Sequence, residues 1–324
     1  MRPNSRVDQA EGLRRLLARP GEAQNLDAGL PASYPAESHQ AEIIMVVAGK
    51  PGVGCTSATI NLAAALAQLG KKVMVLDENG GSSDRLHGHG LPARHDLPAQ
   101  HDLLDVVQGR CTLSEATLTT NGFSMLCAAR VMSKFSRLNQ NEQQRLHETL
   151  IEVSDGMDVL LVDSATPAPI RSMRSGQNAH GGIEGLIGQI SISANLASKA
   201  VLLVVADATA SGITESYALI KRLSLENVNL HFEIMMNKVS DEQAAMAVFG
   251  NMAKVARHNL TTRLGYFGCV PVDDRLKRAT KSGRSVVEFF PAAVSAKSYF
   301  GLAQKICKEN KIRQHIGEIS FVVN

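Results

Sequence analysis

One stretch of the chain restricts the fold more than any other: residues 43–70, which read IIMVVAGKPGVGCTSATINLAAALAQLG. The apolar, β-branched run from Ile43 to Val47 predicts a buried parallel strand, a glycine-rich turn follows, and apolar residues then recur at helical spacing. Glycines in such a turn let successive N–H groups approach one anion, and the N-terminus of the next helix adds its positive dipole end. The stretch predicts a strand, a phosphate loop and a helix, although a glycine-rich turn that binds nothing fits the same pattern.

Apolar runs separated by amphipathic segments continue along the rest of the chain. Short runs rich in Val, Ile and Leu predict buried strands, and apolar residues at helical spacing predict helices. This alternation predicts an α/β fold with a mostly parallel sheet and helices on both faces. The expected strands are 72–77, 123–127, 157–163, 200–206, 232–236 and 264–270, and a surface helix is expected over 141–153.

Length and charge limit the possible classes of protein. A chain of 324 residues with 44% hydrophobic content can bury one full α/β core. The 34 Lys and Arg residues nearly balance the 31 Asp and Glu residues, which argues against a dedicated nucleic-acid binder. The N-terminus has no apolar leader region, and no window reaches the roughly 18 apolar residues of a spanning helix. We therefore expect a cytoplasmic protein.

Neither the cysteines nor the histidines have the spacing of a metal site. The five cysteines contain no C-x-x-C pair, which argues against a zinc site or a disulfide framework and for a reducing compartment. Between Arg85 and Gln100 the chain is rich in His, Gly and Pro without a carboxylate-backed H-x-x-x-H pair. A solvated loop is the favoured interpretation there. The histidines in question are His87, His89, His95 and His101.

Both ends of the chain differ from the core. Val7 to Leu17 predicts a short amphipathic helix, and residues 18–41 are rich in Ala, Pro and Gly and predict a flexible linker. The helix suits a partner's groove, but it could also dock on its own domain. Near the other end, Ala296 to Gln314 mixes apolar and basic residues. It is expected to pack as the last core helix, at least over its first half, or its distal basic part lies on anionic lipid. Residues 311–324 are expected to form a C-terminal tail.

The phosphate loop resembles that of the MinD/ParA family, a branch of the P-loop NTPases with the pattern K-G-G-x-G-K-T. Here Gly49 to Ser57 reads G-K-P-G-V-G-C-T-S, so Pro51 replaces a glycine and Cys55 replaces the second lysine. The resemblance extends along residues 42–310 and implies a short helix at 101–110 and a helix at 211–221, and it includes the segment at 271–279. It implies that these residues contact ATP: Gly49, Lys50, Pro51, Gly52, Val53, Gly54, Cys55, Thr56, Ser57, Asn237 and Pro271.

The resemblance also implies roles at the magnesium and water positions. Thr56 and Asp163 match the magnesium-binding residues of the family, and Asp77 matches the first aspartate of switch I. The second aspartate, which positions the attacking water, is replaced by Asn79. An amide cannot accept a proton from water at neutral pH. The missing ammonium at Cys55, or a thiolate formed there, would also weaken phosphate binding.

An N-terminal motif narrows the resemblance to the FlhG proteins, called FleN in some bacteria, which are the flagellar branch of the MinD/ParA family. Residues 8–14 read D-Q-A-E-G-L-R and are similar to the family's D-Q-A-x-x-L-R motif, which engages the signal-recognition-type GTPase FlhF and stimulates its hydrolysis of GTP. The matching positions are Asp8, Gln9, Ala10, Leu13 and Arg14.

Three hypotheses follow from this combination. The leading one is a catalytically degenerate regulator of flagellar number or placement that acts by binding an FlhF-like GTPase. The second is a working ATPase switch that forms a homodimer around nucleotide, with Lys50 reaching across the interface. The third, a partition protein of the ParA type that binds DNA without specificity, is the least compatible with the near-neutral charge.

Overall fold

The computed structural model describes residues 41–79, 101–119, 122–164, 200–226, 230–260 and 262–322, without the side chains of residues 136, 226 and 309–322. The chain divides into two compact units, Met1–Ser38 and His39–Asn324, and the described residues belong to the second unit. The N-terminal motif, the linker before Ala41 and the histidine-rich segment at 85–100 lie outside the described residues, as does the glycine-rich segment at 167–189.

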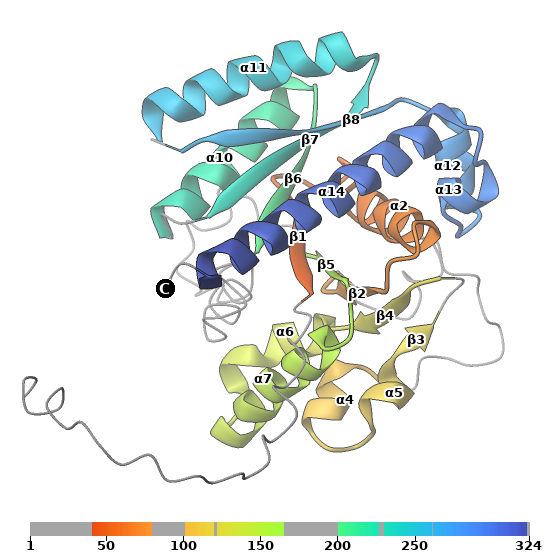
Figure 1. Ribbon diagram of the computed structural model, residues 1–324, viewed down its shortest axis with the longest axis vertical. Helices are drawn as coiled ribbons and strands as arrows, with labels where there is room; N and C mark the ends of the chain where they lie inside the picture. Colours follow the sequence, from red (N-terminus) through yellow and green to blue (C-terminus); the bar gives the residue numbers. More distant parts are fainter. Residues whose placement is uncertain are drawn as a thin grey trace, which may run out of the picture. The chain divides into compact units, whose positions relative to one another are not determined.

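The described strands form one sheet in the order β3-β4-β2-β5-β1-β6-β7-β8 (Figure 1). All described pairs are parallel except β3 with β4. The α/β fold and the mostly parallel sheet predicted from the sequence are therefore confirmed. The strands are β1 (Glu42–Ala48), β2 (Val73–Asp77), β3 (Leu118–Thr119), β4 (Ser124–Cys127), β5 (Val159–Asp163), β6 (Val201–Asp207), β7 (His231–Val239) and β8 (Leu264–Pro271).

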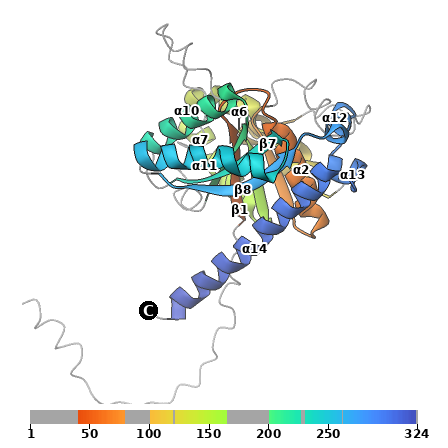
Figure 2. The ribbon, with the colours of Figure 1, turned by 90° about the horizontal axis from the view of Figure 1, so that it is seen from above.

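Helices cover both faces of the sheet because its central strands alternate between two apolar cores. On β1, Ile43 and Met45 belong to one core with residues of α7, α10 and α11, whereas Ile44 and Val46 belong to the other with residues of α2, α12, α13 and α14. Figure 2 shows α10 and α11 on one side of the strands and α14 on the other. These helices are α2 (Cys55–Gln68), α7 (Gln140–Ser154), α10 (Ala210–Glu226), α11 (Glu242–Asn259), α12 (Asp274–Lys281), α13 (Val286–Phe289) and α14 (Val294–Val322).

Short helices occupy the stretch between β2 and β5, and capping side chains fix where they begin. The side chain of Asp102 accepts hydrogen bonds from the backbone N–H groups of Leu104 and Asp105 at the start of α4. Such caps satisfy N–H groups that have no partner within the helix. These helices are α4 (Leu103–Val107), α5 (Leu113–Ala116), α6 (Ala129–Lys134) and the 3-10 turn η1 (Phe135–Arg137).

The last helix, α14, packs against α2 with its first half. Tyr299, Leu302 and Ile306 are buried there, which confirms the predicted core packing of this part. The helix continues to Val322, through the position 311 at which we expected a tail to begin. In the described part of the chain, no helix has the length and apolarity needed to cross a membrane.

Candidate functional site

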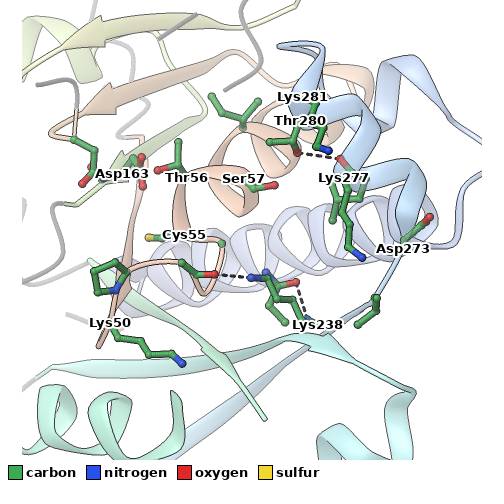
Figure 3. A pocket seen from close by; sticks show the side chains of 18 of the residues that line it. Lys50, Cys55, Thr56, Ser57, Asp163, Lys238, Asp273, Lys277, Thr280 and Lys281 are labelled. Atoms are coloured by element: carbon green, nitrogen blue, oxygen red, sulfur yellow. Dashed lines mark hydrogen bonds between the residues drawn. The ribbon is translucent and has the colours of Figure 1, made fainter. Parts of the chain in front are cut away.

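A cavity of about 770 Å³ lies at the carboxyl ends of the strands, between the phosphate loop and α12 (Figure 3). Ligand sites of open α/β sheets occur at this edge. Two residues predicted to contact the nucleotide, Gly49 and Val53, do not line the cavity. Two lysines of α12 that the sequence analysis did not predict, Lys277 and Lys281, do line it. The predicted residues that line it are Lys50, Pro51, Gly52, Gly54, Cys55, Thr56, Ser57, Asp77, Asn79, Asp163, Asn237 and Pro271.

The backbone of the phosphate loop keeps the shape of an anion cradle. Gly52 and Gly54 have φ angles of 82° and 102°, in the region that favours glycine. Gly49 lies so close to α10 that a Cβ atom there would overlap the backbone of Glu215. Pro51 contributes no N–H group to the cradle. The loop can therefore offer backbone N–H groups to an anion, with one fewer than a glycine at position 51 would provide.

Two residues at the end of β7 fix the phosphate loop by donating side-chain hydrogen bonds to its backbone carbonyls. Asn237 Nδ2 donates a 2.8 Å hydrogen bond to the Val53 carbonyl, and Lys238 Nζ donates to the Gly52 carbonyl. Lys238 has a φ of 56°, the left-handed conformation that is uncommon outside glycine. Asn237 Oδ1 also accepts from Lys238 N at 3.0 Å. The asparagine expected to contact the base therefore retains one amide hydrogen and one lone pair for a ligand.

The Lys50 side chain is held away from the cradle, toward β6 and α10. Its ammonium donates to Thr209 Oγ1 at 3.0 Å and Ser211 Oγ at 2.9 Å, and lies 3.5 Å from Asp207 Oδ2. Figure 3 shows it extending away from Thr56 and Asp163. Burial opposes ionisation of Asp207, but hydrogen bonds from Thr209 and the charge of Lys50 outweigh it and lower the pKa of that carboxyl.

Cys55 stands in the position of the missing lysine as a buried, neutral thiol. Its Sγ donates to the Val46 carbonyl of β1 at 3.3 Å, so it points into the sheet. Burial, and then the nearby Asp163 carboxylate, raise the pKa of this thiol well above its usual value. The direction of this shift disfavours the thiolate that the sequence left open. The cradle receives no charge of either sign from this position.

Asp163, at the end of β5, is 2% exposed and lacks the counter-charge that a lysine at position 55 would provide. Its burial raises the pKa of the carboxyl, opposed by hydrogen bonds from Thr56, Asn79, Cys55 and Thr59. Its buried Oδ2 has no hydrogen-bond partner among the described residues. A hydroxyl and an open carboxylate oxygen are hard donors, so Thr56 and Asp163 fit Mg²⁺.

Asn79 ties the ends of β2 and β5 together. Its backbone N–H donates to Asp77 Oδ1 at 2.8 Å, and its Nδ2 lies 3.3 Å from the carbonyl oxygens of both Asp163 and Ser164. An ionised aspartate could not donate either of the latter bonds. In this chain the residue at the water-positioning place of switch I therefore acts as a link between two strand ends.

Comparison with known proteins agrees with this geometry. The model of the AAA domain family matches residues 41–173. Antiactivator FleN of Pseudomonas aeruginosa is 32% identical over 269 residues, which cover 83% of this chain and 87% of FleN. The septum site-determining protein MinD of Helicobacter pylori is 26% identical over 276 residues, covering 82% of this chain and 91% of that protein.

Among solved structures, the MinD cell division protein of Aquifex aeolicus matches with a TM-score of 0.58 at 21% identity, covering 83% of this chain and 97% of that one. MinD of Pyrococcus horikoshii in complex with Mg-ADP matches with a TM-score of 0.56 at 19% identity, covering 84% and 98%. At these identities the structures show the fold alone. With the match to FleN across most of both chains, they establish that this chain belongs to the FlhG/FleN family of MinD/ParA proteins.

Proposed function

We propose that this protein is a cytoplasmic FlhG-like regulator of flagellar number or placement that acts by binding, with weak or no ATPase activity. The observation that carries the proposal is the buried thiol of Cys55, which points to Val46 where the family has an ammonium facing the phosphates. Electrostatic stabilisation supplies most of phosphoryl-transfer catalysis, and losing one such contact commonly lowers the rate about 100-fold or more. Asn79 replaces the aspartate that positions the attacking water in the family, so a second contribution to catalysis is also missing.

The cavity retains what nucleotide binding needs. The N–H groups of the phosphate loop and of the first turn of α2 can bind phosphate oxygens, and Thr56 with Asp163 can hold magnesium, which neutralises phosphate charge when it is bound. Pro271 and Val272 provide an apolar wall at the end of β8 for the base. We therefore expect ATP to bind weakly and to turn over slowly.

The partner that fits the N-terminal motif is an FlhF-like GTPase. The motif residues Asp8, Gln9, Ala10, Leu13 and Arg14 match the family's segment at every defined position. In this proposal the short helix binds the GTPase and stimulates its hydrolysis of GTP, while the linker tethers it to the P-loop domain. The relative's name, antiactivator, favours a regulatory role of this kind.

A pull-down with the GTPase tests the proposal. Full-length protein should retain the GTPase, whereas deletion of Met1 to Leu17 or the double substitution L13A/R14A should abolish retention. Substitution of Arg15, which is adjacent to the motif but outside it, by Ala serves as the matched control and should leave retention intact. Equal retention by the deletion variant would contradict the proposed binding mode.

The second candidate function is an active ATPase switch that dimerises around nucleotide. The open oxygen of Asp163 beside Thr56 favours it. Calorimetry with ATP and magnesium, followed by measurement of phosphate release, distinguishes the two: turnover equal to that of a relative with an intact loop, lost on Asp163→Ala, supports the switch. A peripheral contact of the basic C-terminal segment with the inner face of the cell membrane stays a prediction, tested by liposome flotation after truncation beyond Lys305.

A further inference from the structure

Within the described part of the chain, four lysines line the cavity, and two of them are engaged elsewhere. Lys50 is bound to Thr209 and Ser211 outside the cradle, and Lys238 donates to the Gly52 carbonyl. The other two, Lys277 and Lys281, come from α12, on the wall that faces the phosphate loop.

Lys277 and Lys281 lie four residues apart and share one side of the helix. Figure 3 shows both with Thr280 on the wall of the cavity. Lys277 Nζ is 2.9 Å from Asp274 Oδ1, but the two side chains are 64% and 87% exposed, so this pair is weak. Lys281 has no ion pair with any described residue. Both ammonium groups are therefore available to a ligand.

The wall that carries them is fixed in place. The carboxylate of Asp273 caps α12 by accepting from Arg275 N at 2.9 Å, and it also accepts from Ser295 N and Oγ of α14 at 3.1 and 2.8 Å. Ala279, which belongs to α12, is fully buried in the core. A helix anchored in this way presents its lysines without a conformational change on binding.

Three aspartates also line the cavity, and among the described residues none of them forms an ion pair with Lys277 or Lys281. The carboxylate of Asp273 is held by α12 and α14, and Asp77 accepts from the backbone of Asn79. Asp163 lies beside Thr56, on the other side of the cavity from the lysines of α12 (Figure 3). Lys277 and Lys281 therefore bring two positive charges to the α12 wall, on the side opposite Cys55, in addition to the charge of Lys238 behind the loop.

We propose that Lys277 and Lys281 neutralise the phosphates of a nucleoside di- or triphosphate in this cavity, in place of the ammonium missing from the phosphate loop. This inference rests on the proposed nucleotide binding. It places the positive charge that contacts the phosphates on α12, whereas the family pattern places it on the phosphate loop. The affinity for ATP should therefore depend on the charge of its phosphates and fall as the salt concentration rises, because salt screens their attraction to the lysines of α12.

The test is a titration of the full-length protein with ATP and with adenosine at low and high salt. The double substitution K277Q/K281Q should weaken ATP binding about tenfold, at roughly threefold for each exposed charge contact, and should flatten the salt dependence. Adenosine affinity should not change, and K277R/K281R should retain tight ATP binding. Lys254 of α11 is exposed and does not line the cavity, so Lys254→Gln is the matched control.

Three results would overturn the proposal. Unchanged ATP affinity in the glutamine variant would show that the α12 lysines do not contact the phosphates. An equal loss for adenosine would show that they shape the cavity and do not provide charge. Absence of ATP binding by the unaltered protein would remove the ligand itself. In each case the pull-down with the GTPase still decides the proposed function independently.

Discussion

Substitution of Cys55 by Lys restores an ammonium to the phosphate loop and tests what its loss has done. The Cys55 thiol is close enough to Asp163 for that carboxylate to raise its pKa, so a lysine there has a buried counter-charge. A hydrogen bond between charged groups contributes about 1.5–3 kcal/mol. On that basis, ATP should bind about 10- to 150-fold more tightly to the variant.

The assay is isothermal titration of the full chain with ATP and magnesium. Without nucleotide, the larger, charged side chain should lower the free energy of unfolding by about 1–3 kcal/mol, because position 55 is buried in the core. Cys55→Met, which has similar length and no charge, is the control and should not improve binding. If the methionine variant gained as much affinity as the lysine variant, or if Cys55→Lys bound no more tightly, the reasoning from charge would be refuted.

Three further predictions concern the strand ends and the loop. Asn79→Asp should lower the free energy of unfolding by about 1–2 kcal/mol, since two amide donations are lost beside a buried carboxylate; urea denaturation measures this, and unchanged stability would count against the link. Asp163→Asn should stabilise the ligand-free protein at neutral pH, because burial raises the pKa of this carboxyl and so disfavours its charged form. The stability that the protonated carboxyl contributes is fully present below its unfolded pKa of 3.8 and is lost as the pH rises through its folded pKa. The free energy of unfolding of the variant should therefore vary less with pH over that window. Gly49→Ala should destabilise the fold through overlap with the Glu215 backbone, whereas Gly250→Ala, where a Cβ meets nothing within 4 Å, should not; equal melting temperatures for the two would contradict the loop geometry.

The sequence predicted most of the fold because the central strands are apolar except for one acidic residue at an end of each. β1, β5 and β6 are buried along nearly their whole length, which gives the continuous apolar runs of a parallel sheet. The antiparallel strand β3 was not predicted, since Leu118–Thr119 is too short to show a period. We expected a tail from residue 311, whereas α14 continues to Val322. Ile312, Ile316 and Ile319 recur there at helical spacing, a signal that the basic residues between them obscured.

The position of the site could be predicted, but the direction of its side chains could not. The glycines of the loop and the strand-ending carboxylates mark the cavity in local sequence. In contrast, Lys50 contacts Thr209, 159 residues away, and Lys238 contacts Gly52 across 186 residues. The burial of Cys55 against Val46 likewise depends on the packing of α2 on the sheet. Such contacts leave no spacing pattern, so the charge of the site could not be placed from the sequence.

The most direct test of the account measures GTP hydrolysis by the FlhF-like GTPase in the presence of this protein, with and without ATP. If the protein acts by binding through its N-terminal motif, stimulation should be the same without ATP and should disappear on deletion of Met1 to Leu17. Stimulation that requires ATP, or that survives the deletion, would contradict the central claim.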